Sequence, residues 1–212
     1  GYEQPTIDSI PFLLPESLLS KKDISPITLR YTAGAIWRAL YRGDMIRHNK
    51  LLFPSNLPLN EDRIFNICAI GCSKSVYYLK QPLYHYWINS GSATAKYREN
   101  MLDIILHTQS LTKEALLRHW DASYVPIYEQ VNLIDGAMIC IYNAFSPTVK
   151  MAFQKRYKLV QEIVCHPEIQ KALQSKTELN YKQKLLIRKQ SMALCLFAML
   201  RNARNKLFFK KH

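Results

Sequence analysis

From Tyr97 to the C terminus the sequence is a series of helix-compatible segments separated by short breakers, and this pattern restricts the chain to a mostly helical fold. Three of the breakers combine proline with polar residues, and the fourth, at 175–180, is a polar run without proline. They end helices because proline lacks the backbone N–H donor and short polar side chains compete for backbone hydrogen bonds. The predicted helices cover residues 98–120, 124–145, 148–164, 167–175 and 181–208. The breakers lie at 121–126, 146–147, 166–167 and 175–180.

The first part of the chain contains only short elements. Four prolines, at positions 5, 11, 15 and 26, interrupt any long helix, although residues 15–21 are compatible with a single helical turn. Residues 29–46 suggest a helix–strand corner, and the β-branched and aromatic residues of 75–79 and 83–88 predict two strands. We therefore expect an α+β, mostly helical fold, with a first domain over 1–96 and a C-terminal helical region over 97–212 that ends in a basic helix.

A further helix is predicted to begin after Asn60. Asparagine is a favoured N-cap, and Glu61 and Asp62 then lie in the first turn, where the helix dipole stabilises negative charge. Apolar residues supply one face of this helix, and Gly71 is expected to end it. The apolar residues are Ile64, Phe65, Ile67 and Cys68.

The cysteines do not form a metal-binding motif. No two of them are spaced as CxxC, and although Cys68 and Cys72 share a helix face, no histidine lies close by in sequence to complete a zinc site. We expect buried free thiols, no metal bound by this chain and a reducing, cytoplasmic compartment. The five cysteines are Cys68, Cys72, Cys140, Cys165 and Cys195.

No segment has the pattern of a signal peptide. The longest apolar stretch runs from Met192 to Leu200, which is too short to span a bilayer. The sequence therefore favours a cytoplasmic protein, with peripheral attachment to the inner face of the membrane as a further option.

The net charge of +13 is concentrated at the C-terminal end, because no acidic residue follows Glu178. Residues 192–200, within this basic segment, are apolar on all sides, so no clean amphipathic stripe is predicted. One interpretation is an interfacial helix on an anionic membrane surface. The alternative is a buried terminal helix with a solvated basic end. Nucleic acid is not expected as a partner, since aromatic residues do not alternate with the basic ones. The basic residues are Lys182, Lys184, Arg188, Lys189, Arg201, Arg204, Lys206, Lys210 and Lys211.

An ordered set of short motifs runs from Trp37 to Thr94, namely Trp37 with Leu40-Tyr41-Arg42, Phe53-Pro54, Glu61-Asp62, Pro82-Leu83-Tyr84 and Ser92. It resembles the second half of bacterial family-2 glycosyltransferases of the GT-A type, which build capsules, lipopolysaccharide and other surface glycans. The chain differs from the usual family pattern at Ala39, Trp87 and Asn89, where lysine, arginine and histidine are common.

The resemblance implies an inverting transfer of a sugar from a nucleotide sugar to a glycan or lipid-linked acceptor in surface polysaccharide synthesis. In that family the aspartate of the Glu-Asp pair is the general base, which here is Asp62, while Glu61 would bind acceptor hydroxyls or orient Asp62. The alternative is that both carboxylates only cap the helix. Trp37 and Tyr41 would line the acceptor site or, alternatively, belong to the core.

Asn89 and Ser92 lie in a predicted loop that follows residues 83–88. In the family this loop approaches the diphosphate or the acceptor, so the resemblance assigns both residues to substrate binding. The sequence has no Asp-x-Asp and no glycine-rich phosphate loop. We therefore expect a fragment that lacks the nucleotide-sugar half and is inactive alone, with Mg²⁺ or Mn²⁺ bound only in the complete enzyme. The alternative function is a non-catalytic helical interaction or membrane-docking module.

Overall fold

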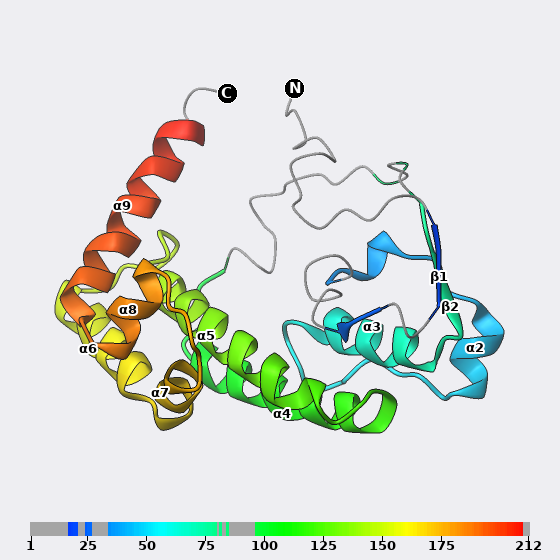
Figure 1. Cartoon of the computed structure of the whole chain (residues 1–212). Helices are drawn as coiled ribbons and strands as arrows, with labels where there is room; N and C mark the ends of the chain where they lie inside the picture. Colours follow the sequence, from blue (N-terminus) through cyan, green and yellow to red (C-terminus); the bar gives the residue numbers. More distant parts are fainter. Residues whose placement is uncertain are drawn as a thin grey trace. The chain divides into compact units, whose positions relative to one another are not determined.

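The computed structural model describes residues 17–20, 24–26, 34–79, 81, 84 and 96–209. As predicted, the fold over these residues is mostly helical with a small antiparallel sheet (Figure 1). The chain forms two compact units, unit 1 from residues 1–87 with 110–128, and unit 2 from 88–109 with 129–212. The helices α4 (Met101–His119) and α5 (Tyr124–Ala144) each contribute to both units. The predicted domain boundary at residues 96–97 stays a prediction.

The sheet of unit 1 pairs two strands from distant parts of the sequence. Strand β1 (Ser17–Ser20) runs antiparallel to β2 (Ser75–Tyr78), with Leu19 opposite Val76. Both side chains pack against a small core of Ile24 and Ile70. The predicted helical turn over 15–21 is therefore wrong for residues 17–20, because pairing with β2 places Leu19 on this core. Strand β2 confirms the first predicted strand, and the second, over 83–88, lies outside the described residues except at position 84.

Helical turns replace the predicted helix–strand corner over the described part of residues 29–46. These turns are the 3-10 helix η3 (Ile36–Arg38) and α2 (Gly43–His48). The next helix, α3 (Glu61–Cys72), begins at Glu61 as expected, but Gly71 does not end it. A second core cluster in unit 1 consists of Leu51, Phe65 and Ala69.

Gly71 is buried inside α3 because another segment approaches it closely. A Cβ atom at this position would lie 2.6 Å from the Cβ of His119 and 2.7 Å from Nε1 of Trp120. The same indole N–H donates to the carbonyl oxygen of Ile67, at an N···O distance of 2.9 Å. The glycine is thus explained by packing and not by helix termination.

Unit 2 continues with α6 (Phe153–Cys165) and α7 (Pro167–Gln174), close to the predicted segments. Helix α6 begins five residues later than position 148, where the sequence predicted its start. The Arg156 guanidinium holds the preceding loop by donating to the carbonyl oxygens of Ala144, Val149 and Met151. This loop is therefore fixed by a side chain of the helix that follows it.

The predicted single helix over 181–208 is wrong, because two helices occupy this segment. Helix α8 (Tyr181–Ile187) is followed by α9 (Ser191–Phe209), and Lys189 between them has a left-handed backbone with φ 53°. Asn180 begins α8 with a capping box, in which its side chain accepts from the Gln183 N–H and its own N–H donates to the Gln183 side chain.

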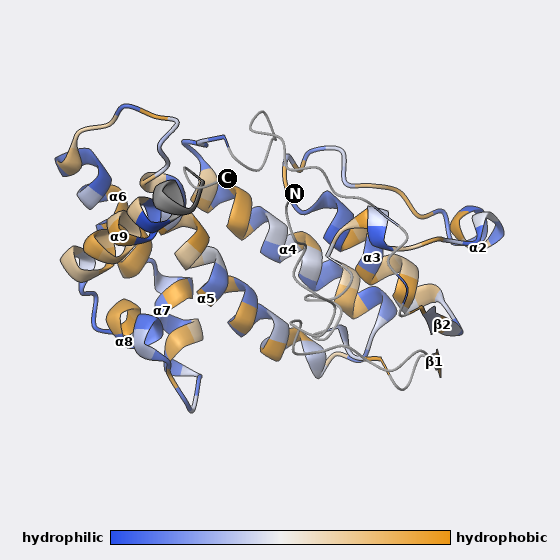
Figure 2. Ribbon diagram, turned by 90° about the horizontal axis from the view of Figure 1, so that it is seen from above, coloured by the Kyte–Doolittle hydropathy of each residue, from blue (hydrophilic) through white to orange (hydrophobic). Residues whose placement is uncertain are grey.

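In the core of unit 2, α7 and α9 each pack on both α6 and α8. Figure 2 shows by colour that these helices carry both hydrophobic and hydrophilic residues. Across the described ranges, no helix combines the length and apolar character needed to cross a membrane. Side chains from all four helices are buried in this core, namely Val160, Val164, Leu173, Leu186, Leu194, Cys195 and Ala198.

The cysteines are free thiols in different environments. Cys140 and Cys195 are buried as expected, whereas Cys68 and Cys72 are half-buried. Burial raises the pKa of Cys140 to about 12 and that of Cys68 to about 11. The expectation of burial is wrong for Cys165, which is exposed at the end of α6.

Candidate active site

The predicted catalytic carboxylates lie at the first turn of α3. Asn60 occupies the N-cap position, but it has a left-handed backbone (φ 67°) and its side chain makes no capping hydrogen bond. Its carbonyl oxygen accepts from the N–H of Ile64 at 3.2 Å. Glu61 and Asp62 follow, both half-buried. The N-terminal end of the helix therefore favours negative charge through its backbone dipoles and not through a capping side chain.

Asp62 is held by the backbone and not by a cation. Its Oδ1 atom accepts from the N–H of Arg63 at 2.7 Å. Within the described residues, neither Asp62 nor Glu61 forms a salt bridge. Arg42, part of the Leu-Tyr-Arg motif, instead pairs with Asp44 at 2.6 Å between Nη2 and Oδ2. This pairing lowers the pKa of Asp44. Arg42 is thus paired with Asp44 and not with the carboxylates of α3.

Tyr41 lies beside the first two turns of α3. Its hydroxyl donates to Oδ1 of Asn66, a buried residue one helical turn after Asp62. Burial, and secondarily the negative charge of Asp62, raise the pKa of Tyr41 to about 12. The phenol therefore stays protonated at neutral pH and acts as a hydrogen-bond donor next to the predicted base.

Asn66 is a residue of this site that sequence reasoning missed. It follows Asp62 by four positions, which places both side chains on the same side of the helix. It is also a polar residue within the apolar run of α3, and a buried amide needs hydrogen-bond partners. Those two signals together identify it as part of the polar side of the site.

The aromatic rings near α3 are packed against one another. Phe65 meets Tyr41 edge-on, with ring centroids 5.5 Å apart, and stacks on Phe53 at 4.3 Å. Phe53 is 48% exposed and thus presents a flat apolar face to solvent. Tyr41 packs against the core cluster around Phe65 and also contacts Asn66. Its role in the acceptor site stays a prediction.

Trp37 is also engaged by neighbouring side chains. Its ring stacks on Tyr84 at 4.8 Å between centroids, and the guanidinium of Arg38 lies over it at 4.9 Å. Its role in acceptor binding stays a prediction. The other two predicted substrate-binding residues, Asn89 and Ser92, lie outside the described residues.

The fold brings one histidine close to the cysteines of α3. Nδ1 of His119 lies 3.3 Å from Sγ of Cys72, although the two residues are far apart in sequence. Across the described part of the chain, however, no group of three His, Cys, Asp or Glu side chains could hold a metal ion.

Comparison with known proteins supports a glycosyltransferase. A 72-residue stretch of the chain is 38% identical to a protein of Bacillus subtilis (strain 168) named "Putative glycosyltransferase EpsH". The stretch covers 33% of this chain and 21% of that protein, so the chain spans about one fifth of its relative's length in this match. The chain thus has distant, partial homology to a protein that carries this name. No family model and no solved structure matches it.

Proposed function

We propose that this chain carries the acceptor-side catalytic half of an inverting family-2 glycosyltransferase of the GT-A type. The observation that carries the proposal is the first turn of α3. There Glu61 and Asp62 lie together at the positive end of a helix, and no salt bridge within the described residues neutralises them. The partial homology to a glycosyltransferase supports the same class of reaction.

In the proposed reaction, Asp62 acts as the general base. An acceptor hydroxyl gives its proton to the Asp62 carboxylate while its oxygen forms a bond to the anomeric carbon of the donor sugar. The bond from that carbon to the nucleoside diphosphate breaks on the opposite face, so the configuration inverts. Glu61 binds acceptor hydroxyls or orients Asp62, and Trp37, Tyr41, Asn89 and Ser92 contact the substrates.

The proposal assigns the nucleotide sugar to a part of the enzyme other than these 212 residues. The described residues contain no metal-ligating cluster, so Mg²⁺ or Mn²⁺ would bind with the donor in that other part. The acceptor is a glycan or a lipid-linked glycan of surface polysaccharide synthesis, which places the enzyme in the cytoplasm or at the inner face of the membrane.

The experiment is an Asp62→Asn substitution in the full-length protein. Loss of the base should lower turnover by about 10²- to 10⁴-fold, with donor binding little changed. Asp44→Asn is the matched control, because Asp44 is likewise an aspartate in the first turn of a helix but is paired with Arg42. A variant Asp62→Asn that keeps most of its turnover would show that another group is the base.

A second candidate function, a membrane-docking module, is favoured by a specific observation on α9. Large apolar side chains on this helix are exposed, among them Leu196 at 52% and Leu200 at 70%. Basic side chains lie on the same helix, and no acidic residue follows Glu178. Docking and sugar transfer are compatible in one enzyme that acts on a lipid-linked acceptor.

A further inference from the structure

Helix α9 has a buried face and an exposed apolar face. Leu194, Cys195 and Ala198 are fully buried in the core of unit 2. A second set of apolar side chains follows the spacing i, i+4, i+7, i+8, which places them in one stripe along the helix. This apolar stripe consists of Met192, Leu196, Met199 and Leu200, all between 46% and 70% exposed. The sequence alone had suggested no such division.

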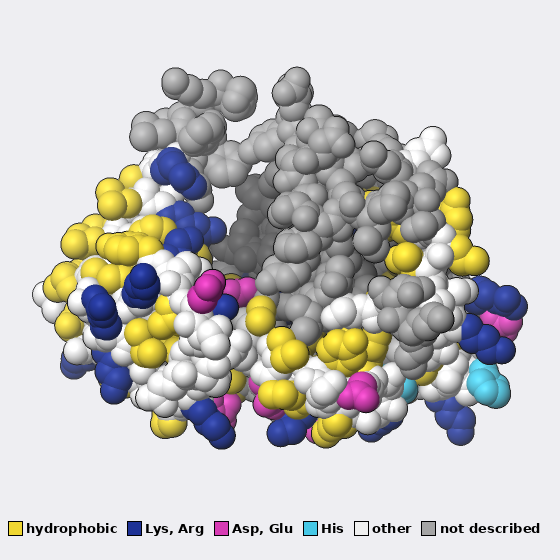
Figure 3. All heavy atoms as spheres, in the orientation of Figure 1, with side chains coloured by type: hydrophobic (Ala, Val, Ile, Leu, Met, Phe, Trp, Pro, Cys, Tyr) yellow, Lys and Arg dark blue, Asp and Glu magenta, His cyan; other side chains and the backbone are white. Residues whose placement is uncertain are grey.

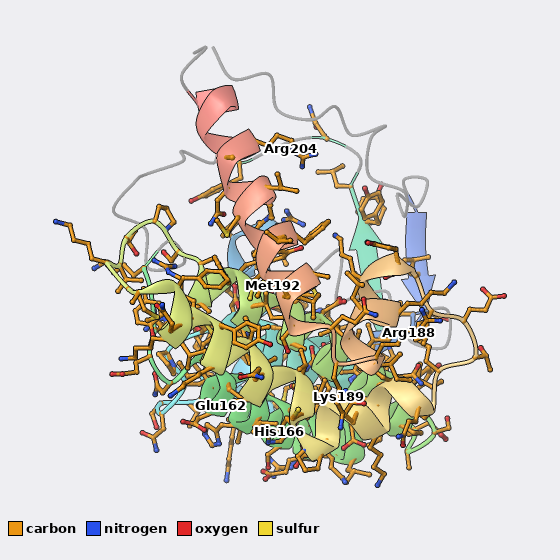
Figure 4. All side chains as sticks on the ribbon, turned by 90° about the vertical axis from the view of Figure 1, so that its left-hand side faces the viewer. Glu162, His166, Arg188, Lys189, Met192 and Arg204 are labelled. Atoms are coloured by element: carbon orange, nitrogen blue, oxygen red, sulfur yellow. The ribbon has the colours of Figure 1, made fainter. Side chains whose placement is uncertain are left out.

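A basic cleft of about 230 Å³ lies beside the apolar stripe. Figure 3 shows Lys and Arg side chains next to the hydrophobic ones over α9, and Figure 4 shows Met192 and, further along the helix, Arg204. The lining residues come from α5, α8 and α9, and they are Tyr142, Lys182, Phe197, Leu200, Arg201 and Arg204.

Two of the three cations in the cleft are positioned by aromatic rings. Nζ of Lys182 lies 4.9 Å from the ring centre of Phe197, and Cζ of Arg201 lies 3.9 Å from that of Tyr142. A cation over a ring face is held electrostatically while its N–H donors remain available at the edges. The rings therefore preorganise positive groups without neutralising them.

The charge in the cleft is not balanced by acidic side chains. Over the described ranges, no carboxylate forms a salt bridge with Lys182, Arg201 or Arg204. Converging arginine and lysine side chains of this kind suit a phosphate group, which accepts several charge-assisted hydrogen bonds at once. The cleft is thus chemically suited to an anionic, phosphate-bearing ligand.

We propose that the cleft binds the phosphate of an anionic phospholipid headgroup while the apolar stripe enters the acyl boundary of the same bilayer. Leu200 connects the two, since it lines the cleft and belongs to the stripe. A free phosphate would use the cleft alone and would leave the stripe in water. This inference rests on the second candidate function, membrane docking, and is independent of Asp62.

The test is sedimentation of the 212-residue chain with vesicles of phosphatidylcholine alone or with added phosphatidylglycerol. The wild type should pellet with the anionic vesicles, bind neutral ones weakly and be partly released at 1 M salt, where the Debye length is about 3 Å. The triple variant Lys182→Gln/Arg201→Gln/Arg204→Gln should lose roughly 100-fold in partitioning, because each basic residue near an anionic surface adds about a factor of five.

A matched variant controls for total charge. Lys150→Gln/Lys158→Gln/Lys171→Gln also removes three exposed cations from unit 2, but none of them lines the cleft. This control should bind much more tightly than the cleft variant. Equal losses in the two triple variants would overturn the site and leave only general attraction between a basic protein and an anionic surface.

A second pair of variants tests the apolar stripe. Leu196→Gln/Leu200→Gln should weaken vesicle binding at high salt, whereas Leu117→Gln/Ile127→Gln, which changes two comparably exposed residues elsewhere, should not. If Leu196→Gln/Leu200→Gln bound the vesicles fully, and if millimolar inorganic phosphate displaced the wild type from them, the cleft would be a site for free phosphate. That result would overturn lipid docking. No pelleting of the wild type would overturn docking altogether, without bearing on Asp62.

Discussion

The two units of this protein differ in how their cores are built. In unit 2, the helices α6, α7, α8 and α9 pack on one another, and their buried side chains, such as Val160, Leu173 and Leu194, form the core. In unit 1, by contrast, clusters around Ile24 with Ile70 and around Phe65 join short elements that lie far apart in the sequence. The candidate base lies in unit 1 and the proposed lipid site in unit 2. The polar groups of the candidate active site therefore lie at the start of α3, directly after a loop, and functional residues are often found where a loop meets a packed element.

The largest effect on stability is expected in the core of unit 2. Leu194→Ala should lower the free energy of unfolding of unit 2 by about 2–5 kcal/mol, because it removes a fully buried side chain and leaves a cavity. Leu196→Ala, one half-turn away and 52% exposed, should cost less than about 0.5 kcal/mol. Hydrogen exchange of α6 and α9 amides would measure both, and equal effects would contradict the assigned buried face of α9.

A smaller effect is expected from filling the contact at Gly71 in unit 1. Gly71→Ala gains about 1 kcal/mol of helix propensity but forces apart α3 and the residues at 119–120, which costs about 1–3 kcal/mol. Trp120 fluorescence during urea unfolding should report the net loss. Gly43→Ala is the control, since its new methyl group meets only the end of the exposed Arg47 side chain. If Gly71→Ala instead stabilised the protein, the contact between α3 and residues 119–120 would be less close than the structure shows.

The smallest effect concerns Tyr41 and depends on pH. Tyr41→Phe should cost about 1 kcal/mol at pH 7 by removing the hydrogen bond to Asn66. An unfolded tyrosine titrates near pH 10, whereas the pKa of Tyr41 is about 12. The native state therefore binds the proton of the Tyr41 hydroxyl more tightly than the unfolded state does. The contribution of Tyr41 to folding stability is full below pH 10 and is lost as the pH rises from about 10 to 12.

The difference in urea midpoint between wild type and Tyr41→Phe should accordingly shrink over that pH range. Tyr181→Phe serves as the control, because Tyr181 is 68% exposed. A constant difference from pH 7 to pH 11.5 would contradict the burial of the phenol and its proximity to Asp62.

Local sequence signals determined several of the helices and the start of α3. Helix breakers act through the backbone of a few neighbouring residues, so 167–175 and 124–145 matched α7 and α5 to within one residue. Glu61 and Asp62 also lie in the first turn of α3 as predicted, although the side chain of Asn60 makes no capping hydrogen bond.

Only the tertiary structure decided the features that depend on distant partners. The pairing of β1 with β2, the need for glycine at position 71 and the hydrogen bond from Tyr41 to Asn66 each join residues far apart in the chain. The division of α9 into a buried and an exposed face arises in the same way. Residues 192–200 are apolar all round, so periodicity could not choose a face, and packing against α6 and α8 chose it.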